Sequence, residues 1–231
     1  LTLSFFPKHA DCVLNYEKAM RERNRLLKEK MTDDVWYKAL ERQMAQNGLL
    51  IQSNRIAALK KISSAQENST TTFPIAELSL SKTNGDLTTD EDEYVKALSE
   101  NRQLDIMAGR TLIGPHRSDM EANYKEKGIS AKDSSTGEQK AMLISIVLAN
   151  ARALKLELGY PPVILLDEIS AHLDIDRRGA LYEEINALGA QAWMTGTDKN
   201  LFSEFGCKAK YFHVIESSGI SDIKEVDFFV D

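Results

Sequence analysis

The chain has 231 residues, 42% of them hydrophobic, which is enough for one or two domains with a packed core. Its formal net charge of −6 at pH 7 excludes a general basic field for nucleic acid, so any DNA contact must be local. The two cysteines, Cys12 and Cys207, lie far apart without metal-ligand spacing, which favours a reducing compartment over a disulfide framework. The sequence shows neither a signal peptide nor an apolar run of about 18 residues, so we expect a cytoplasmic protein without a membrane partner.

After a short apolar stretch closed by Pro7, helix-forming residues dominate from residue 12 to residue 31. Basic side chains outnumber acidic ones in this helix, and four of them are candidate DNA contacts: Arg21, Arg23, Arg25 and Lys28. Two interpretations remain open, a solvated face with local ion pairs and a strip that contacts phosphates.

A second helix is expected from a cap at Asp33 or Thr32 to about residue 65. Two consecutive long helices predict an antiparallel arm. The apolar side chains of the second helix recur at roughly helical spacing and should form the core of the arm: Trp36, Leu40, Met44, Ile51, Ala58 and Ile62.

A small cap on the arm follows, with a strand over residues 75–80 and a turn at Asn84 and Gly85. The acidic residues 88–93 then begin another helix. We expect this helix to place four apolar side chains on one face: Tyr94, Leu98, Leu104 and Met107.

The character of the sequence changes from helical to strand and turn around Gly109, where we place a domain boundary. Residues 1–109 would form the arm, and residues 110–231 a second lobe. A strand over residues 111–113 should lead into the turn of Gly114, Pro115, His116 and Arg117. The last two side chains would face a nucleotide or a partner subunit, or simply belong to a turn fixed by glycine and proline.

The second lobe opens with a serine turn and a long helix that ends at Gly159. Ser135 is expected to cap this helix, with Glu138 closing a capping box, while Gly137 lets a ligand approach the backbone. The free amides and the positive helix end favour a terminal phosphate. The alternative is a helix cap without a ligand.

The apolar residues 163–166 predict a buried parallel strand, whose carboxyl end is where doubly wound sheets bind ligands. Asp167 suits a magnesium ion carried by nucleotide phosphates, and Glu168 suits the polarisation of an attacking water. The alternative is a strand end with two solvated acids. The serine turn and the paired carboxylates, about 30 residues apart in this order, together indicate a nucleotide-handling protein.

The remaining elements alternate: a helix over residues 177–188, a buried strand over 191–194, a short helix over 201–205, and closing strands over 211–215 and 226–230. This alternation predicts an α/β fold, a parallel sheet with helices on both faces, with the helical arm inserted into it.

The stretch from Ser135 to Asp174 resembles the signature motif, Walker B motif and D-loop of ATP-binding-cassette-type ATPases. Residues 164–181, with Arg177 and Leu181, are more narrowly similar to the RecF family of bacterial DNA replication and repair proteins, as are residues 16–24 and 114–119. The resemblance assigns the signature motif to Ser135, Thr136, Gly137, Glu138 and Gln139, and the D-loop to Ala171, His172, Leu173 and Asp174.

The sequence departs from the cassette pattern in several places. Thr136 and Glu138 stand where the signature usually has glycine and glutamine, and Thr197 stands near the position of a phosphate-sensing histidine, whose role its hydroxyl could take. No G-x-x-x-x-G-K-[ST] phosphate loop occurs, and the first residue is Leu1. We therefore expect a carboxyl-terminal fragment without the Walker A half, inactive alone as an ATPase.

The resemblance implies an ATP- and Mg²⁺-dependent homodimer that clamps single-stranded and gapped DNA and loads the RecA recombinase with RecO and RecR. In this family each ATP lies between the phosphate loop of one subunit and the signature turn of the other. The alternatives are the head of another chromosome-structuring or double-strand-break repair ATPase and an interaction module without catalysis.

Overall fold

The chain forms two compact units, residues 1–69 with 75–134, and residues 70–74 with 135–231. The computed structural model describes residues 1–69, 71–81, 88–168, 173–217 and 219–227. The expected turn at Asn84 and Gly85 lies outside these ranges. The division by compactness falls after Ser134 and not near Gly109, where the sequence predicted a boundary.

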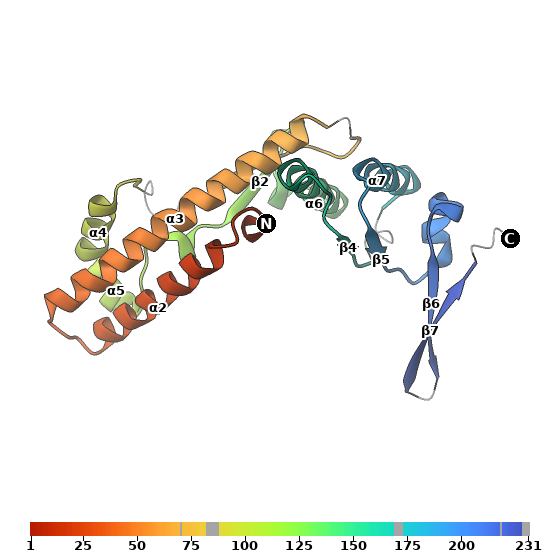
Figure 1. Ribbon diagram of the computed structural model, residues 1–231. Helices are drawn as coiled ribbons and strands as arrows, with labels where there is room; N and C mark the ends of the chain where they lie inside the picture. The colour runs from red at the N-terminus through yellow and green to blue at the C-terminus, as the bar shows by residue number, and fades with distance from the viewer. Residues whose placement is uncertain (70, 82–87, 169–172, 218, 228–231) are drawn as a thin grey trace. The chain divides into compact units, whose positions relative to one another are not determined.

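Two long helices dominate the first unit, α2 (His9–Lys28) and α3 (Asp34–Glu67), after the short α1 (Thr2–Phe5). They pack side by side as the predicted antiparallel pair (Figure 1). α3 begins where expected, because the Asp33 side chain accepts hydrogen bonds from the amides of Val35 and Trp36. The predicted α3 stripe is buried except for Trp36, which is 46% exposed in the first turn.

The expected third helix is divided at Asn101 into α4 (Glu91–Glu100) and α5 (Arg102–Ala108). Tyr94 and Leu98 are buried as predicted, but the predictions for Leu104 and Met107 were wrong, because their side chains are 55% and 82% exposed. The break rotates α5 so that it buries Asp105 instead.

A three-stranded antiparallel sheet completes the first unit: β1 (Ala76–Leu80), β2 (Met120–Tyr124) and β3 (Ile129–Ser130). β1 pairs with β2 in the register Leu78 to Ala122, and this pairing draws residues beyond Gly109 into the first unit. The side-chain amide of Gln66 holds the start of β1 by bonding both the N–H and the C=O of Ala76.

The predicted strand over residues 111–113 is not formed. The Thr111 amide donates to the Asn24 side chain, and the Leu112 amide donates to Asp105. Because side chains already satisfy these backbone donors, no sheet partner is required. The 3-10 helix η1 (Pro115–Arg117) follows directly.

The second unit is a small α/β lobe built on a parallel pair of strands, β4 (Ile164–Leu166) and β5 (Ala192–Met194). Helices α6 (Thr136–Leu158) and α7 (Ile175–Leu188) pack against the β4 side chains Ile164 and Leu166. α6 ends at Gly159 as predicted, in a left-handed conformation. The core of the lobe consists mainly of α6, β4 and α7 side chains.

β4 alternates in exposure, whereas its sequence predicted burial of the whole run. Leu165 is 73% exposed, and Trp193 beside it in the ladder is 55% exposed. These two side chains lie on the face opposite the one formed by Ile164 and Leu166, since successive residues of a strand point to opposite faces.

The 3-10 helix η4 (Lys199–Lys208) and the antiparallel hairpin of β6 (Tyr211–Ser217) and β7 (Ile220–Val226) close the lobe (Figure 1). The last strand was predicted over residues 226–230, but β7 ends at Val226, and residues 228–231 lie outside the described part. Gly219 has a φ of +78°, so it reverses the chain and lets β7 begin at Ile220.

Candidate nucleotide site

The amino end of α6 carries the predicted capping box. The Ser135 hydroxyl accepts a hydrogen bond from the Glu138 amide at 3.3 Å, and the Ser135 amide donates to Glu138 Oε2 at 2.8 Å. Thr136 and Gly137 occupy the first turn, where backbone amides have no acceptor within the helix. No atom lies within 4 Å of a side chain built at Gly137, so a ligand could reach this backbone.

Asp167 and Glu168 directly follow β4, and both are exposed, as predicted for residues at the carboxyl end of a parallel strand. The Thr195 hydroxyl contacts both residues: it donates to Asp167 Oδ1 at 2.5 Å and accepts from the Glu168 amide at 2.9 Å. Glu168 has a φ of +51°, a left-handed conformation that is uncommon for a residue with a side chain.

Sequence reasoning missed Thr195 and selected Thr197. Thr195 directly follows β5, and its amide donates to the Leu166 carbonyl at 3.0 Å, which continues the parallel ladder. Thr197 is exposed two residues further along. A signal for Thr195 was available, because the residues that follow two paired parallel strands lie side by side.

The D-loop expected from the resemblance is described only in its second half, since Ala171 and His172 lie outside the described residues. Leu173 is buried in the core of the lobe. The Asp174 side chain caps α7 by accepting from the Arg177 amide at 2.8 Å. Leu173 therefore contributes to the core and Asp174 to the start of α7, whether or not they also contact a nucleotide.

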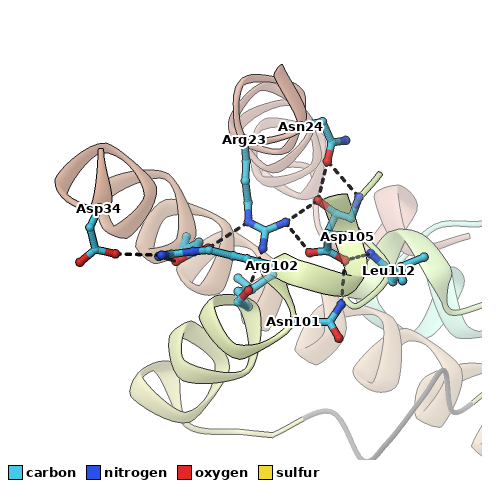
Figure 2. A network of polar contacts seen from close by, with 10 residues as sticks. Arg23, Asn24, Asp34, Asn101, Arg102, Asp105 and Leu112 are labelled. Carbon is cyan, nitrogen blue, oxygen red and sulfur yellow. Dashed lines mark hydrogen bonds and ion pairs between the residues drawn. The ribbon is translucent and has the colours of Figure 1, made fainter. Parts of the chain in front are cut away.

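Arg23, one of the four candidate DNA contacts, is fully buried, and this corrects the prediction. Its side chain is 0% exposed and forms ion pairs with Glu41 at 3.0 Å and with Asp105 at 2.7 Å. It also donates to the Thr111 hydroxyl and to the Leu98 carbonyl. Figure 2 shows this guanidinium enclosed by groups from α3, α5 and the segment after Gly109. Phosphate cannot reach Arg23 in this structure.

Arg102 extends the same network. Its guanidinium makes a two-point contact with Glu41, at 2.8 Å and 2.6 Å, and a third contact with Asp34 at 2.8 Å. The hydrogen bonds to Glu41 raise the pKa of Arg102 above its ordinary value. We call Arg23, Glu41, Asp105 and Arg102 the arm ion network; its two cations and two anions balance.

The other three basic candidates are exposed on α2. Arg21 donates to the Glu17 carbonyl, and Arg25 pairs with Glu22 at 2.8 Å one turn away. Such exposed local pairs contribute little free energy and separate readily, so Arg21, Arg25 and Lys28 stay available to a phosphate backbone. Both earlier interpretations of this face therefore stay open, and three of the four candidates remain predictions.

The turn of residues 114–117 is held by the first unit itself. His116 Nδ1 lies 2.9 Å from the Tyr16 hydroxyl, and His116 Nε2 lies 3.1 Å from the Thr111 carbonyl oxygen. Burial lowers the pKa of His116 and raises that of Tyr16 well above its ordinary value. Both ring nitrogens of His116 therefore have internal partners, although the residue as a whole is exposed, as Arg117 is.

Among the described residues, no group of three or more His, Cys, Asp or Glu side chains could hold a metal ion on its own. Asp167 offers one exposed carboxylate, a donor set that suits a magnesium ion whose other ligands are phosphates and water. None of the described helices is both long and apolar enough to cross a bilayer.

Comparison with known proteins identifies relatives of this chain. No protein-family model matches the sequence. The chain is 44% identical over 223 residues to the DNA replication and repair protein RecF of Rhizobium leguminosarum bv. trifolii, a match that covers 94% of this chain and 60% of that protein. It is 45% identical over 221 residues to the DNA replication and repair protein RecF of Agrobacterium fabrum, covering 93% of this chain and 59% of the relative.

Two solved structures of the recombination mediator protein RecF in the RecFOR pathway, one described with ATPrS and one with ATP, superpose with TM-scores of 0.71 and 0.70. Each is 22% identical to this chain, and each match covers 94% of this chain and 59% of the solved chain. At this level of identity the matches show the fold alone. The α/β lobe and the helical arm thus have the fold of these RecF structures. The chain is a homologue of the RecF proteins over 93–94% of its length, and it spans about 60% of the relatives it matches.

Proposed function

We propose that this chain is the signature and Walker B part of an ATP-dependent DNA clamp that acts in the repair of gapped DNA. The observation that carries the proposal is the pairing, within one lobe, of a capped helix end at Ser135 with exposed carboxylates at the end of β4. The similarity to RecF proteins supports the same function.

In this proposal the lobe contributes to two different nucleotides. Asp167 would hold the magnesium ion of ATP bound to its own subunit, and Glu168 would accept a proton from the attacking water. The signature residues 135–139 face the terminal phosphate of ATP bound to the opposing subunit, where backbone amides and the helix end favour negative charge. Magnesium ATP would supply the phosphoryl group, and these residues would position it for transfer to water. Thr197 remains a candidate phosphate sensor.

The clamp would be a homodimer closed by ATP, working in the cytoplasm with RecO and RecR on single-stranded and gapped duplex DNA. The RecFOR pathway named for the structurally similar proteins supports these partners. The exposed basic side chains Arg21, Arg25 and Lys28 would contact phosphates on one face of α2.

The test is ATP turnover by the full-length protein with and without gapped duplex DNA. We expect weak turnover that DNA stimulates, a dimer that forms only with ATP and Mg²⁺, and no turnover by residues 1–231 alone. A full-length protein that binds DNA equally well without ATP, and hydrolyses none, would instead be an interaction module.

A further inference from the structure

We propose that Thr195 is a positioning residue that holds both carboxylate residues of the candidate site through one hydroxyl. The inference rests on the proposed function for the roles of Asp167 and Glu168. It goes beyond that function by naming the group that sets their orientation.

The hydroxyl of Thr195 is used fully. A threonine hydroxyl has one hydrogen to donate and lone pairs to accept. Here the hydrogen points to Asp167 Oδ1 at 2.5 Å, the short range of charge-assisted O–H···O⁻ bonds, and the oxygen accepts from the Glu168 amide at 2.9 Å. The hydroxyl oxygen of Thr195, directly after β5, thus contacts both Asp167 and Glu168.

The backbone that carries this hydroxyl is itself fixed on both sides. Before it, the Thr195 amide continues the β4–β5 ladder by donating to Leu166. After it, Gly196 lies so close to η4 that an added side chain would stand 2.8 Å from the Phe202 ring. The hydroxyl position is therefore determined by the sheet and by η4.

The two carboxylate residues are exposed, as Thr195 is, and their side chains gain little orientation from packing. Glu168 also adopts a left-handed backbone, a conformation that surrounding contacts must maintain. The bond from its amide to Thr195 does so, and it thereby sets the direction in which the Glu168 side chain leaves the chain. Asp167, with Oδ1 occupied, keeps Oδ2 for the metal. Removing a hydrogen bond to a side chain that binds a metal typically weakens metal affinity about 10–100-fold.

The alternative is that Thr195 is only a β-branched residue suited to a strand end. Thr195→Val distinguishes the two interpretations, because valine keeps the shape and the strand preference and removes only the hydroxyl. Thr195→Ser restores the hydroxyl on a smaller side chain. Thr195→Ala is a second variant without the hydroxyl, and Thr32→Val, at an exposed position before α3, is the matched control.

Two measurements on the full-length protein test the proposal. Amide hydrogen exchange at Glu168 without nucleotide should accelerate about fivefold in Thr195→Val and Thr195→Ala, because a lost hydrogen bond has about that effect. ATP turnover should need about tenfold more Mg²⁺ for half-saturation, with kcat lowered about tenfold, in the same two variants. Thr195→Ser should stay within about threefold of the parent, and Thr32→Val should match it.

Unchanged exchange at Glu168, or a valine variant with parental Mg²⁺ dependence and kcat, would overturn the role of Thr195. So would an equal loss in the serine variant, since it would show that the methyl group matters. A parent protein that neither binds nor hydrolyses ATP would instead refute the proposed function, and the role of Thr195 with it.

Discussion

Substituting Arg23 tests the structural role of the arm ion network, because methionine keeps an unbranched apolar stem and removes the charged guanidinium. Arg23→Met would leave a buried cluster with one cation and two anions. Asp105 would keep its bonds from Asn101 at 2.7 Å and from the Leu112 amide at 2.9 Å, but it would lose the guanidinium at 2.7 Å. Removing one member of a buried pair costs about 3–5 kcal/mol. The freed Leu98 carbonyl adds to this cost.

We therefore expect Arg23→Met to lower the free energy of unfolding by about 4 kcal/mol, measured by urea denaturation with far-ultraviolet circular dichroism. Arg21→Met on the exposed face of the same helix is the control and should change stability by about 0.5 kcal/mol or less. A loss below about 1 kcal/mol in Arg23→Met, with weakened DNA binding, would show that Arg23 acts as a phosphate contact instead.

Three further predictions concern the candidate site and the turn after the arm. In the full-length protein, Glu168→Gln should retain ATP binding and slow hydrolysis about 100-fold or more. Asp167→Asn should instead weaken the binding of magnesium nucleotide. Equal losses of binding in the two variants, measured by calorimetry, would contradict these roles. Ser135→Arg should fold and bind ATP yet stay monomeric with ATP and Mg²⁺, and light scattering that finds a parental dimer would leave Ser135 as a helix cap only. The pKa of His116 is lowered from 6.5 by burial, so the unfolded chain takes up its proton first as pH falls, and this stability is complete above pH 6.5 and lost below it. Because His116 is partly exposed, solvent screening reduces the effect. Between pH 7 and pH 5.5 the parent should lose stability more steeply than His116→Gln, by well under the limiting ~1.4 kcal/mol per pH unit, and parallel denaturation profiles would argue against a neutral imidazole held by Tyr16 and Thr111.

Features set by neighbours in sequence were predictable. The cap at Asp33, the capping box of Ser135 and Glu138, and the end of α6 at Gly159 all depend on residues within one helical turn. Helical spacing also identified most of the buried α3 stripe. These rules act locally, so they need no knowledge of what the helix packs against.

Features set by distant partners were not predictable. Helical spacing places Arg23 on the same face of α2 as the buried Tyr16 and Ala19, but its partner Asp105 is 82 residues away and could not be identified from the sequence. The missing strand at residues 111–113 has the same cause, since its donors are satisfied by Asn24 and Asp105. At the candidate site, the choice between Thr195 and Thr197 required the register of β4 and β5.

The arm ion network also has a consequence for how α2 and α3 align. An apolar stripe repeats with every turn, so burial alone allows two helices to slide past one another by about 5.4 Å. The Arg23–Glu41 pair joins one position on each helix, and a slide by one turn would leave a buried charge without its partner. Gly48 constrains this alignment less, because the nearest α2 side chain to an added Cβ there is Tyr16, at 3.4 Å; the closer ring at 2.8 Å is that of Tyr94 on α4.

The last prediction concerns the alignment of α2 and α3 when the arm ion network is removed. Replacing Arg23, Glu41 and Asp105 together by Met, Met and Leu removes three buried charges and leaves Arg102 paired with Asp34 alone. It should therefore restore part of the stability lost in Arg23→Met, as apolar replacements of buried ion pairs do. The alignment of α2 and α3 should then be less well defined. Spin labels at the exposed Lys18 and Lys38, in a background without Cys12 and Cys207, would report it. The parent should give one narrow distance distribution, and the triple variant a broader one or a second peak. A single narrow peak in the stable triple variant would show that apolar packing suffices to align the helices, and that the ion network serves stability alone.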